Sequence, residues 1–181
     1  MDLEQLKYPI GQFKKPAAMT AELLTKYISD IEVFPSNLKK ETARLSDEQL
    51  NKPYRQGGWS IRQVVNHCAD SHMNSMIRFK LALTEDRPTI KGYFEDRWAE
   101  LEDSKTIHVD SALKLLEGLH ERWVILLRSL TGEQLQRVFI HPEQSREISI
   151  EENIGAYAWH CNHHLAQIMN IKKQMSWNKL D

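Results

Sequence analysis

The chain has 181 residues, 41% of them hydrophobic and 27% charged, which is enough for a single domain over residues 1–181 with a substantial core. The 24 Lys and Arg residues nearly balance the 25 Asp and Glu residues, which argues against nucleic acid or an anionic membrane as a partner. The sequence shows no secretion signal and no apolar run long enough to span a membrane, and its two cysteines cannot form a disulfide framework, so we expect a reduced, cytoplasmic protein.

The first part of the chain predicts an irregular segment followed by a long helix. Residues 1–18 are punctuated by Pro and Gly and are expected to lie over the surface of the fold. From Thr20 to Leu45 apolar residues recur with a helical period, which predicts the first helix. Pro35 lies within it, so we expect one helix that is kinked near Phe34 rather than two separate helices.

A second helix is predicted to begin at Ser60, where Ser60 and Gln63 form a capping box that satisfies two free backbone N–H groups. A polar stripe lies directly beside its apolar stripe, whereas a surface helix would place its polar face opposite. This stripe consists of His67, Ser71, Asn74 and Arg78. We expect it to line a cavity inside a bundle.

The second half of the chain predicts two more helices. Residues 84–109 are too long for a tight connection and are expected to contain a small helix near Trp98. The third helix should begin with Asp110 as its N-cap. Residues 138–150 predict a small β-hairpin, and a capping box of Ser149 and Glu152 opens the fourth helix, which extends to residue 173. The predicted fold is therefore all-α, a four-helix bundle.

Three histidines on two of these helices form a candidate metal site. His160 and His164 are four residues apart, so their rings share one face of the last helix. His67 begins the polar stripe of the second helix and supplies a third imidazole. Three neutral imidazoles with open coordination positions suit a catalytic Zn²⁺ or Ni²⁺ ion, so we expect one divalent metal per subunit.

Other polar residues near these ligands have a structural and a functional interpretation. His163 is rotated away from His160 and His164 and is expected to support a ligand or to be exposed. Asp70 could orient a ligand or act as a base, and Asn74 and Arg78 could bind substrate, but all three could equally form a solvated helix flank. His72 and His120 occupy core-type positions, His108 and His141 are expected in loops, and Cys68 and Cys161 are interpreted as small core residues rather than as a redox pair.

Two segments of the sequence resemble a known family. RQGGWSIRQVVNHCADSHMNSMIRFKLALTED, over residues 55–86, and WHCNHHLAQI, over residues 159–168, are similar to the YfiT-like proteins of the DinB superfamily. The resemblance implies a bacterial four-helix bundle, a cytoplasmic homodimer and a metal-dependent hydrolase. It also implies that nickel or zinc is held by one histidine of the Gly-Gly-Trp helix and the two outer histidines of the last helix, here His67, His160 and His164.

Three functions remain open from the sequence. The first is a hydrolase in which the metal activates water for attack on a small-molecule substrate. The second, which the resemblance implies, is a transferase that conjugates bacillithiol or a similar low-molecular-weight thiol to electrophiles. The third is a non-enzymatic stress-response bundle with a structural metal. We adopt the hydrolase as the main prediction, because it is the general description that the resemblance implies. A shared scaffold does not fix the reaction, so the other two functions stay open.

Overall fold

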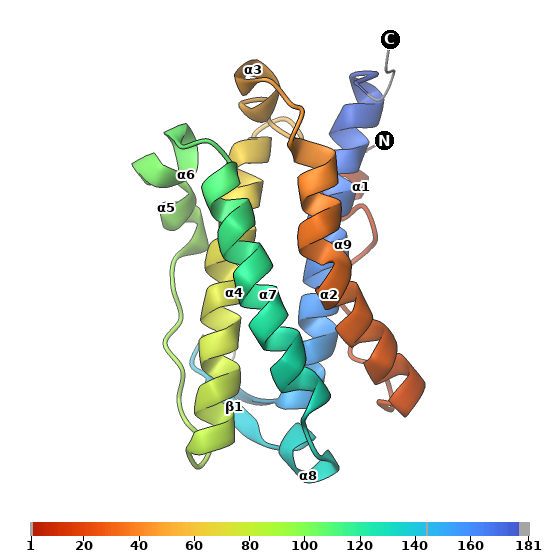
Figure 1. Cartoon of the computed structure of the whole chain (residues 1–181), viewed down its shortest axis with the longest axis vertical. Helices are drawn as coiled ribbons and strands as arrows, with labels where there is room; N and C mark the ends of the chain where they lie inside the picture. The colour runs from red at the N-terminus through yellow and green to blue at the C-terminus, as the bar shows by residue number, and fades with distance from the viewer. Residues whose placement is uncertain (1, 144, 178–181) are drawn as a thin grey trace.

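The protein is an all-α bundle of four long helices, as the sequence predicts. The computed structural model describes residues 2–143 and 145–177. The long helices are α2 (Ala21–Thr42), α4 (Ile61–Thr84), α7 (Asp110–Arg128) and α9 (Ile150–Gln174). Helices α2 and α4 each pack against both α7 and α9, so the four helices enclose one core (Figure 1).

The directions of the helices explain the long connection between α4 and α7. Helices α4 and α7 run the same way along the bundle, opposite to α2 and α9 (Figure 1). The chain must therefore return along the length of the bundle after α4 before α7 can begin. This return segment contains α5 (Glu95–Ala99), which the sequence predicts near Trp98, and also α6 (Glu102–Thr106), which the sequence analysis missed.

Shorter elements lie beside α9 and at the two ends of the bundle (Figure 1). They are α1 (Leu3–Lys7), α3 (Asp47–Leu50), α8 (Gly132–Leu135), β1 (Val138–His141) and β2 (Arg146–Ser149). The predicted hairpin is present, with β1 and β2 antiparallel. Two expectations need correction: residues 1–18 are not wholly irregular, because a capping box of Asp2 and Gln5 starts α1, and His141 belongs to β1 rather than to a loop.

The start of α4 agrees with the sequence analysis, and the start of α7 does not. The predicted capping box of Ser60 and Gln63 is present in full. Asp110 was expected to be the N-cap of α7, but it is the first helical residue, and Val109 occupies the cap without a side-chain hydrogen bond. The carboxylate of Asp110 still lies in the first turn, where it interacts favourably with the helix dipole.

The capping box predicted at the start of α9 is only half formed. The Ser149 hydroxyl accepts a hydrogen bond from the Glu152 backbone N–H. The Glu152 carboxylate does not return to the backbone but forms ion pairs with Lys15 at 2.9 Å and Arg146 at 2.7 Å. Two cationic partners offer charge-assisted bonds that are stronger than a bond to a neutral N–H, so the pairing fixes the N-terminal segment and the hairpin against α9.

Helix α2 is continuous through Pro35, as predicted, and its axis changes direction near its middle (Figure 1). Proline has no backbone N–H and its ring collides with the carbonyl one turn earlier, which bends a helix at that point. Pro35 is itself buried, so it lies on the side of α2 that packs against the other helices of the bundle.

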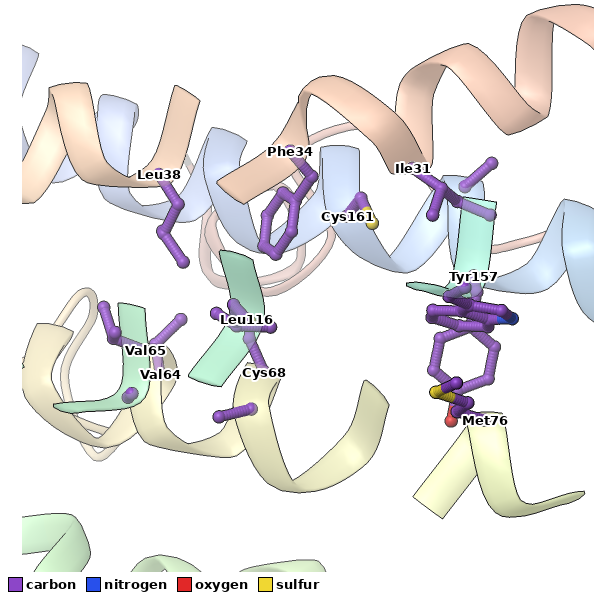
Figure 2. Packing of buried hydrophobic residues seen from close by; sticks show 14 of the residues in the cluster. Ile31, Phe34, Leu38, Val64, Val65, Cys68, Met76, Leu116, Tyr157 and Cys161 are labelled. Carbon is purple, nitrogen blue, oxygen red and sulfur yellow. The ribbon is translucent and has the colours of Figure 1, made fainter. Parts of the chain in front are cut away.

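The apolar core lies between the four long helices. Figure 2 shows Phe34 and Leu38 of α2, Cys161 of α9 and Leu116 of α7 directed towards Cys68 and its neighbours on α4. Both cysteines are fully buried and not joined to each other, which agrees with their interpretation as core residues. In the part of the chain that the structure describes, no helix has the length and apolar character needed to cross a membrane.

Candidate metal centre

The Gly-Gly-Trp segment before α4 positions His67. Gly57 has a φ of +65°, a conformation that side chains with a Cβ rarely adopt. A Cβ on Gly58 would lie 2.7 Å from the Arg55 side chain, so only glycine fits there. This tight turn places the Trp59 ring against the His67 ring, with 4.6 Å between their centroids, and so restricts the orientation of His67.

The three predicted ligands converge on one point. One ring nitrogen from each of His67, His160 and His164 lies within 4.8 Å of the others, and these three form the only such group in the described ranges. The Nε2 atoms of His67 and His160 are 3.2 Å apart. Two imidazole nitrogens bound to Zn²⁺ at about 2.0–2.1 Å in a tetrahedron are separated by about 3.3 Å. The spacing therefore fits a divalent ion of this size.

Burial keeps these imidazoles in the form that binds metals. Burial lowers the pKa of His67 to about 4, and the pKa values of His160 and His164 lie well below the ordinary value of 6.5 for the same reason, with repulsion between the rings adding to it. Neutral imidazole is the metal-binding form. The donor set thus fits an implied Zn²⁺ or Ni²⁺ ion in chemistry as well as in spacing.

Gln167 supports His164, and the sequence analysis did not identify it. The His164 Nδ1–H donates to Gln167 Oε1 at 2.8 Å, which leaves Nε2 of His164 free to bind a metal. The Gln167 amide in turn donates to the backbone oxygen of Lys7 at 3.1 Å and to His163 Nε2 at 3.0 Å. Gln167 lies three residues after His164 on the same helix, and this spacing was the signal available in the sequence.

His163 lies beside the three converging histidines and is not part of their group. Its ring stacks on Trp159 at 4.5 Å between centroids, and its Nε2 accepts the bond from Gln167. Because Gln167 also bonds His164, the structure places His163 two hydrogen bonds from a ligand. The geometry sets His163 apart from His67, His160 and His164, and its predicted role beside the metal ligands stays a prediction.

A cavity of about 750 Å³ opens on one side of the three histidines. It lies between α4, α9, the hairpin and the segment that returns from α4 to α7. His160 is the ligand that reaches its wall. Other polar side chains that line it include Ser71, Arg78, Tyr93, His141 and Tyr157. The cavity is large enough for a drug-sized molecule next to the metal position.

Of the three predicted substrate-binding and catalytic residues, one lines the cavity and two do not. Arg78 lines the cavity and forms no hydrogen bond or ion pair with any described residue. Asn74 donates from its side chain to the backbone oxygen of Asp70 on its own helix at 2.9 Å and is not among the lining residues. Asp70 is half-buried outside the lining, and burial, with Asp103 nearby, raises its pKa to about 6. Its predicted role as a base stays a prediction.

Two tyrosines near the ligands were not identified from the sequence. The Tyr157 hydroxyl, one helical turn before His160, donates to the backbone oxygen of Ser71 at 3.1 Å and lies 3.2 Å from the Ser71 hydroxyl. The Tyr93 hydroxyl is buried in the cavity wall near Ser71 and has no hydrogen-bond partner in the described residues. Burial raises the pKa of Tyr93, so this phenol keeps its proton. Tyr93 lies in the long connection, where no sequence period marks it.

Comparison with known proteins agrees with this fold and site. Residues 31–168 match the family model described as DinB superfamily. The chain is 47% identical over 173 residues to the "Putative metal-dependent hydrolase YfiT" of Bacillus subtilis, covering 96% of this chain and 97% of that protein. It is 51% identical over 175 residues to a "Putative metal-dependent hydrolase" of Bacillus cereus, covering 97% of this chain and 100% of that protein.

A solved structure is similar over almost the whole fold. It is described as "YfiT from Bacillus subtilis is a probable metal-dependent hydrolase with an unusual four-helix bundle topology". The TM-score is 0.94, at 47% identity over 96% of this chain and 99% of that chain. The parallel pair of α4 and α7 agrees with a topology that differs from a simple up-and-down bundle. From the matched residues and the near-complete coverage, this chain belongs to the DinB superfamily.

Proposed function

We propose that the protein is a metal-dependent hydrolase that binds one Zn²⁺ or Ni²⁺ ion through His67, His160 and His164. The convergence of three neutral imidazoles, two buried and one partly buried, beside a cavity carries this proposal. When bound, such an ion supplies Lewis acidity, which polarises a carbonyl or phosphoryl oxygen and acidifies water. The names of the relatives support the same reaction class.

The cavity residues indicate what the protein itself contributes. Arg78 lies eleven residues after His67 on α4, which is about 16 Å along the helix axis. An unpaired arginine in a cavity wall would bind a carboxylate or phosphate group of the substrate. The substrate would then be extended, with an anionic group at one end and the reacting bond near the histidines.

Proton transfer and hydrogen bonding are assigned to groups near the reacting end. The Tyr93 hydroxyl, which keeps its proton, would donate to an oxygen that gains charge during the reaction. Asp70, whose pKa of about 6 is close to neutral pH, would act as the base.

A second candidate reaction is transfer of a low-molecular-weight thiol such as bacillithiol to an electrophile. The observation that favours it is the size of the cavity, which at about 750 Å³ holds more than water and one small substrate. Arg78 would bind the acidic part of the thiol. A homodimer is also proposed, from the family resemblance alone, and light scattering on the purified protein tests it.

The two reactions can be separated with the same preparations. We would load the protein with Zn²⁺ or Ni²⁺ and assay nitrophenyl esters and phosphate esters, with and without an anionic tail. The same preparations would be assayed with bacillithiol and a model electrophile. Product release that needs metal and no thiol supports the hydrolase, whereas conjugation above the uncatalysed rate supports the transferase. Absence of both activities over the whole panel would contradict an enzymatic role.

Removal of the metal tests the third alternative, a structural site. The core in Figure 2 is formed by apolar side chains from all four helices, so its packing does not depend on a bound ion. We therefore expect a chelator to remove the ion and activity while circular dichroism still reports a helical fold. Unfolding on chelation, as in structural zinc sites, would instead favour the non-enzymatic bundle.

A further inference from the structure

Three histidines form a hydrogen-bonded row that leads away from the metal position into the core. His160 Nδ1 lies 3.0 Å from His72 Nε2, and His72 Nδ1 lies 2.7 Å from His120 Nε2. The row ends where His120 Nδ1 lies 2.6 Å from the backbone oxygen of Ile31 on α2. His72 is fully buried and His120 is 2% exposed, so water does not replace these bonds.

Pro35 explains why the Ile31 oxygen is available to a side chain. In a regular helix this oxygen would accept a bond from the backbone N–H of residue 35. Proline has no N–H, so the Ile31 carbonyl has no partner of this kind within α2. The His120 ring on α7 donates to it instead. The proline that bends α2 thus creates the end point of the histidine row.

The end point fixes the direction of every bond in the row. A carbonyl oxygen can only accept, so the proton of the His120 ring is on Nδ1 and its Nε2 must accept. His72 therefore donates from Nδ1 and accepts at Nε2. His160 must then donate from Nδ1, which leaves a bare Nε2, the atom that faces His67. Each bond of the row needs one donor and one acceptor, so a single N–H on each ring satisfies all of them.

We infer that Pro35, His120 and His72 are positioning residues that hold His160 in the tautomer and orientation needed to bind the metal. This inference rests on the metal site of the proposed function, and nothing in it depends on the substrate. With the opposite tautomer, His160 would direct an N–H at the metal position and leave His72 Nε2 without a donor. The fold therefore selects the metal-binding form of His160 before a metal arrives.

The tautomers can be read in the metal-free protein. Long-range proton–nitrogen correlation spectra of ¹⁵N-labelled protein distinguish Nδ1–H from Nε2–H imidazole. We expect His160, His72 and His120 all to carry the proton on Nδ1. A His160 ring that carries it on Nε2 in the folded, metal-free protein would overturn the inference.

Metal affinity tests the consequence. In His120→Leu, His72 loses its acceptor and can adopt either tautomer, so we expect the dissociation constant for Zn²⁺, measured by competition with a chelating dye, to rise about 10- to 100-fold. In His120→Gln the side-chain amide can donate to Ile31 and accept from His72, and we expect it to restore most of the affinity. Cys68→Ala, in the same core, should lower stability and leave affinity unchanged.

Pro35→Ala tests the role of the proline separately. It returns an N–H to the helix, which competes with His120 for the Ile31 oxygen, so metal affinity should fall by less than in His120→Leu. Because Pro35 acts through His120, the double variant should bind as weakly as His120→Leu alone. Additive losses, or normal affinity in a folded His120→Leu variant, would refute the inference. A wild-type protein that binds no Zn²⁺ or Ni²⁺ would instead refute the metal site itself.

Discussion

The two sides of the metal centre are constructed in opposite ways. On the core side, the ring nitrogens of His72 on α4 and His120 on α7 all have partners within 3.0 Å, and the row ends on the Ile31 backbone oxygen of α2. On the cavity side, Arg78 has no partner in the described part of the chain, and the Tyr93 hydroxyl is buried without one. Buried polar groups are normally satisfied, so unpaired ones in a cavity wall indicate a place for a ligand.

This contrast separates what holds the metal from what would meet the substrate. A fully bonded network is rigid and fixes its members in one arrangement. Unpaired donors beside a cavity keep their bonding capacity for another molecule. We therefore expect changes on the core side, at His72 and His120, to affect metal binding and stability. Changes on the cavity side should affect substrate kinetics. The predictions below test that division.

The largest effect is expected from the ligands themselves. His164→Ala should abolish stoichiometric binding of Zn²⁺, because only two of the three imidazoles remain and Gln167 Oε1 no longer has an imidazole to orient. His163→Ala is the matched control on the same helix, and it should keep the metal with less than about a 100-fold loss of affinity. Metal analysis after gel filtration measures both. Equal losses in the two variants would contradict the choice of His164 over His163.

The next largest effect is the dependence of stability on acid pH that His120 causes on the core side. Burial lowers the pKa of His120 from 6.5 to about 4, so between these values the unfolded chain binds a proton that the folded chain does not. Stability from this group is therefore complete above pH 6.5 and is lost as the pH falls towards 4, by about 3 kcal/mol in all and by about 1 kcal/mol between pH 7.5 and 5.5.

Urea unfolding of the metal-free protein at pH 7.5 and 5.5 measures this loss. In His120→Gln the fall in the free energy of unfolding should be smaller by about 1 kcal/mol. Cys68→Ala is the control in the same core: burial raises the pKa of the Cys68 thiol, so it keeps its proton at both pH values and its removal should leave the pH dependence as in the wild type. An identical pH dependence in all three proteins would show that His120 does not titrate on unfolding.

On the cavity side, Arg78→Met should raise KM about 10-fold for substrates with an anionic tail, because a charge-assisted bond is lost. KM for a neutral ester of the same length should not change. Arg128→Met removes an arginine from the outer face of α7, where it pairs with Glu32, and serves as the control. A loss of kcat with unchanged KM would place Arg78 in the reaction rather than in substrate binding.

Sequence reasoning predicted those parts of the fold that depend on local pattern. The capping box at Ser60 and the kinked helix at Pro35 are local features, and both are present. Two cap predictions were wrong. The N-cap of α7 is Val109, one position before the predicted Asp110, and the Glu152 carboxylate forms tertiary ion pairs instead of bonding to the backbone. Helix α6 was missed, since a helix of five residues leaves no period to detect.

The site shows the same limit more sharply. The convergence of His67, His160 and His164 could be predicted, because their spacing and helix faces are encoded locally. His72 and His120 were placed in the core correctly, but their connection to His160 joins three helices and has no sequence signature. Pro35 alone implies that the Ile31 carbonyl lacks its helical N–H partner. That His120 donates to this oxygen follows only from the packing of α7 against α2.

The smallest effect is expected at Tyr93. Tyr93→Phe removes a hydroxyl that has no partner in the described residues, so stability should stay within about 0.5 kcal/mol of the wild type. If this hydroxyl donates to the substrate during the reaction, kcat should fall several-fold while KM changes little.

Tyr157→Phe is the contrasting variant, because its hydroxyl already donates to the backbone oxygen of Ser71. It should lower the free energy of unfolding by about 1 kcal/mol, since a buried acceptor loses its donor. Thermal unfolding and steady-state kinetics of the two variants decide between the roles. If Tyr93→Phe loses stability and keeps its kcat, then the Tyr93 hydroxyl is hydrogen-bonded within the protein. In that case only Arg78 supports the contrast between the core side and the cavity side.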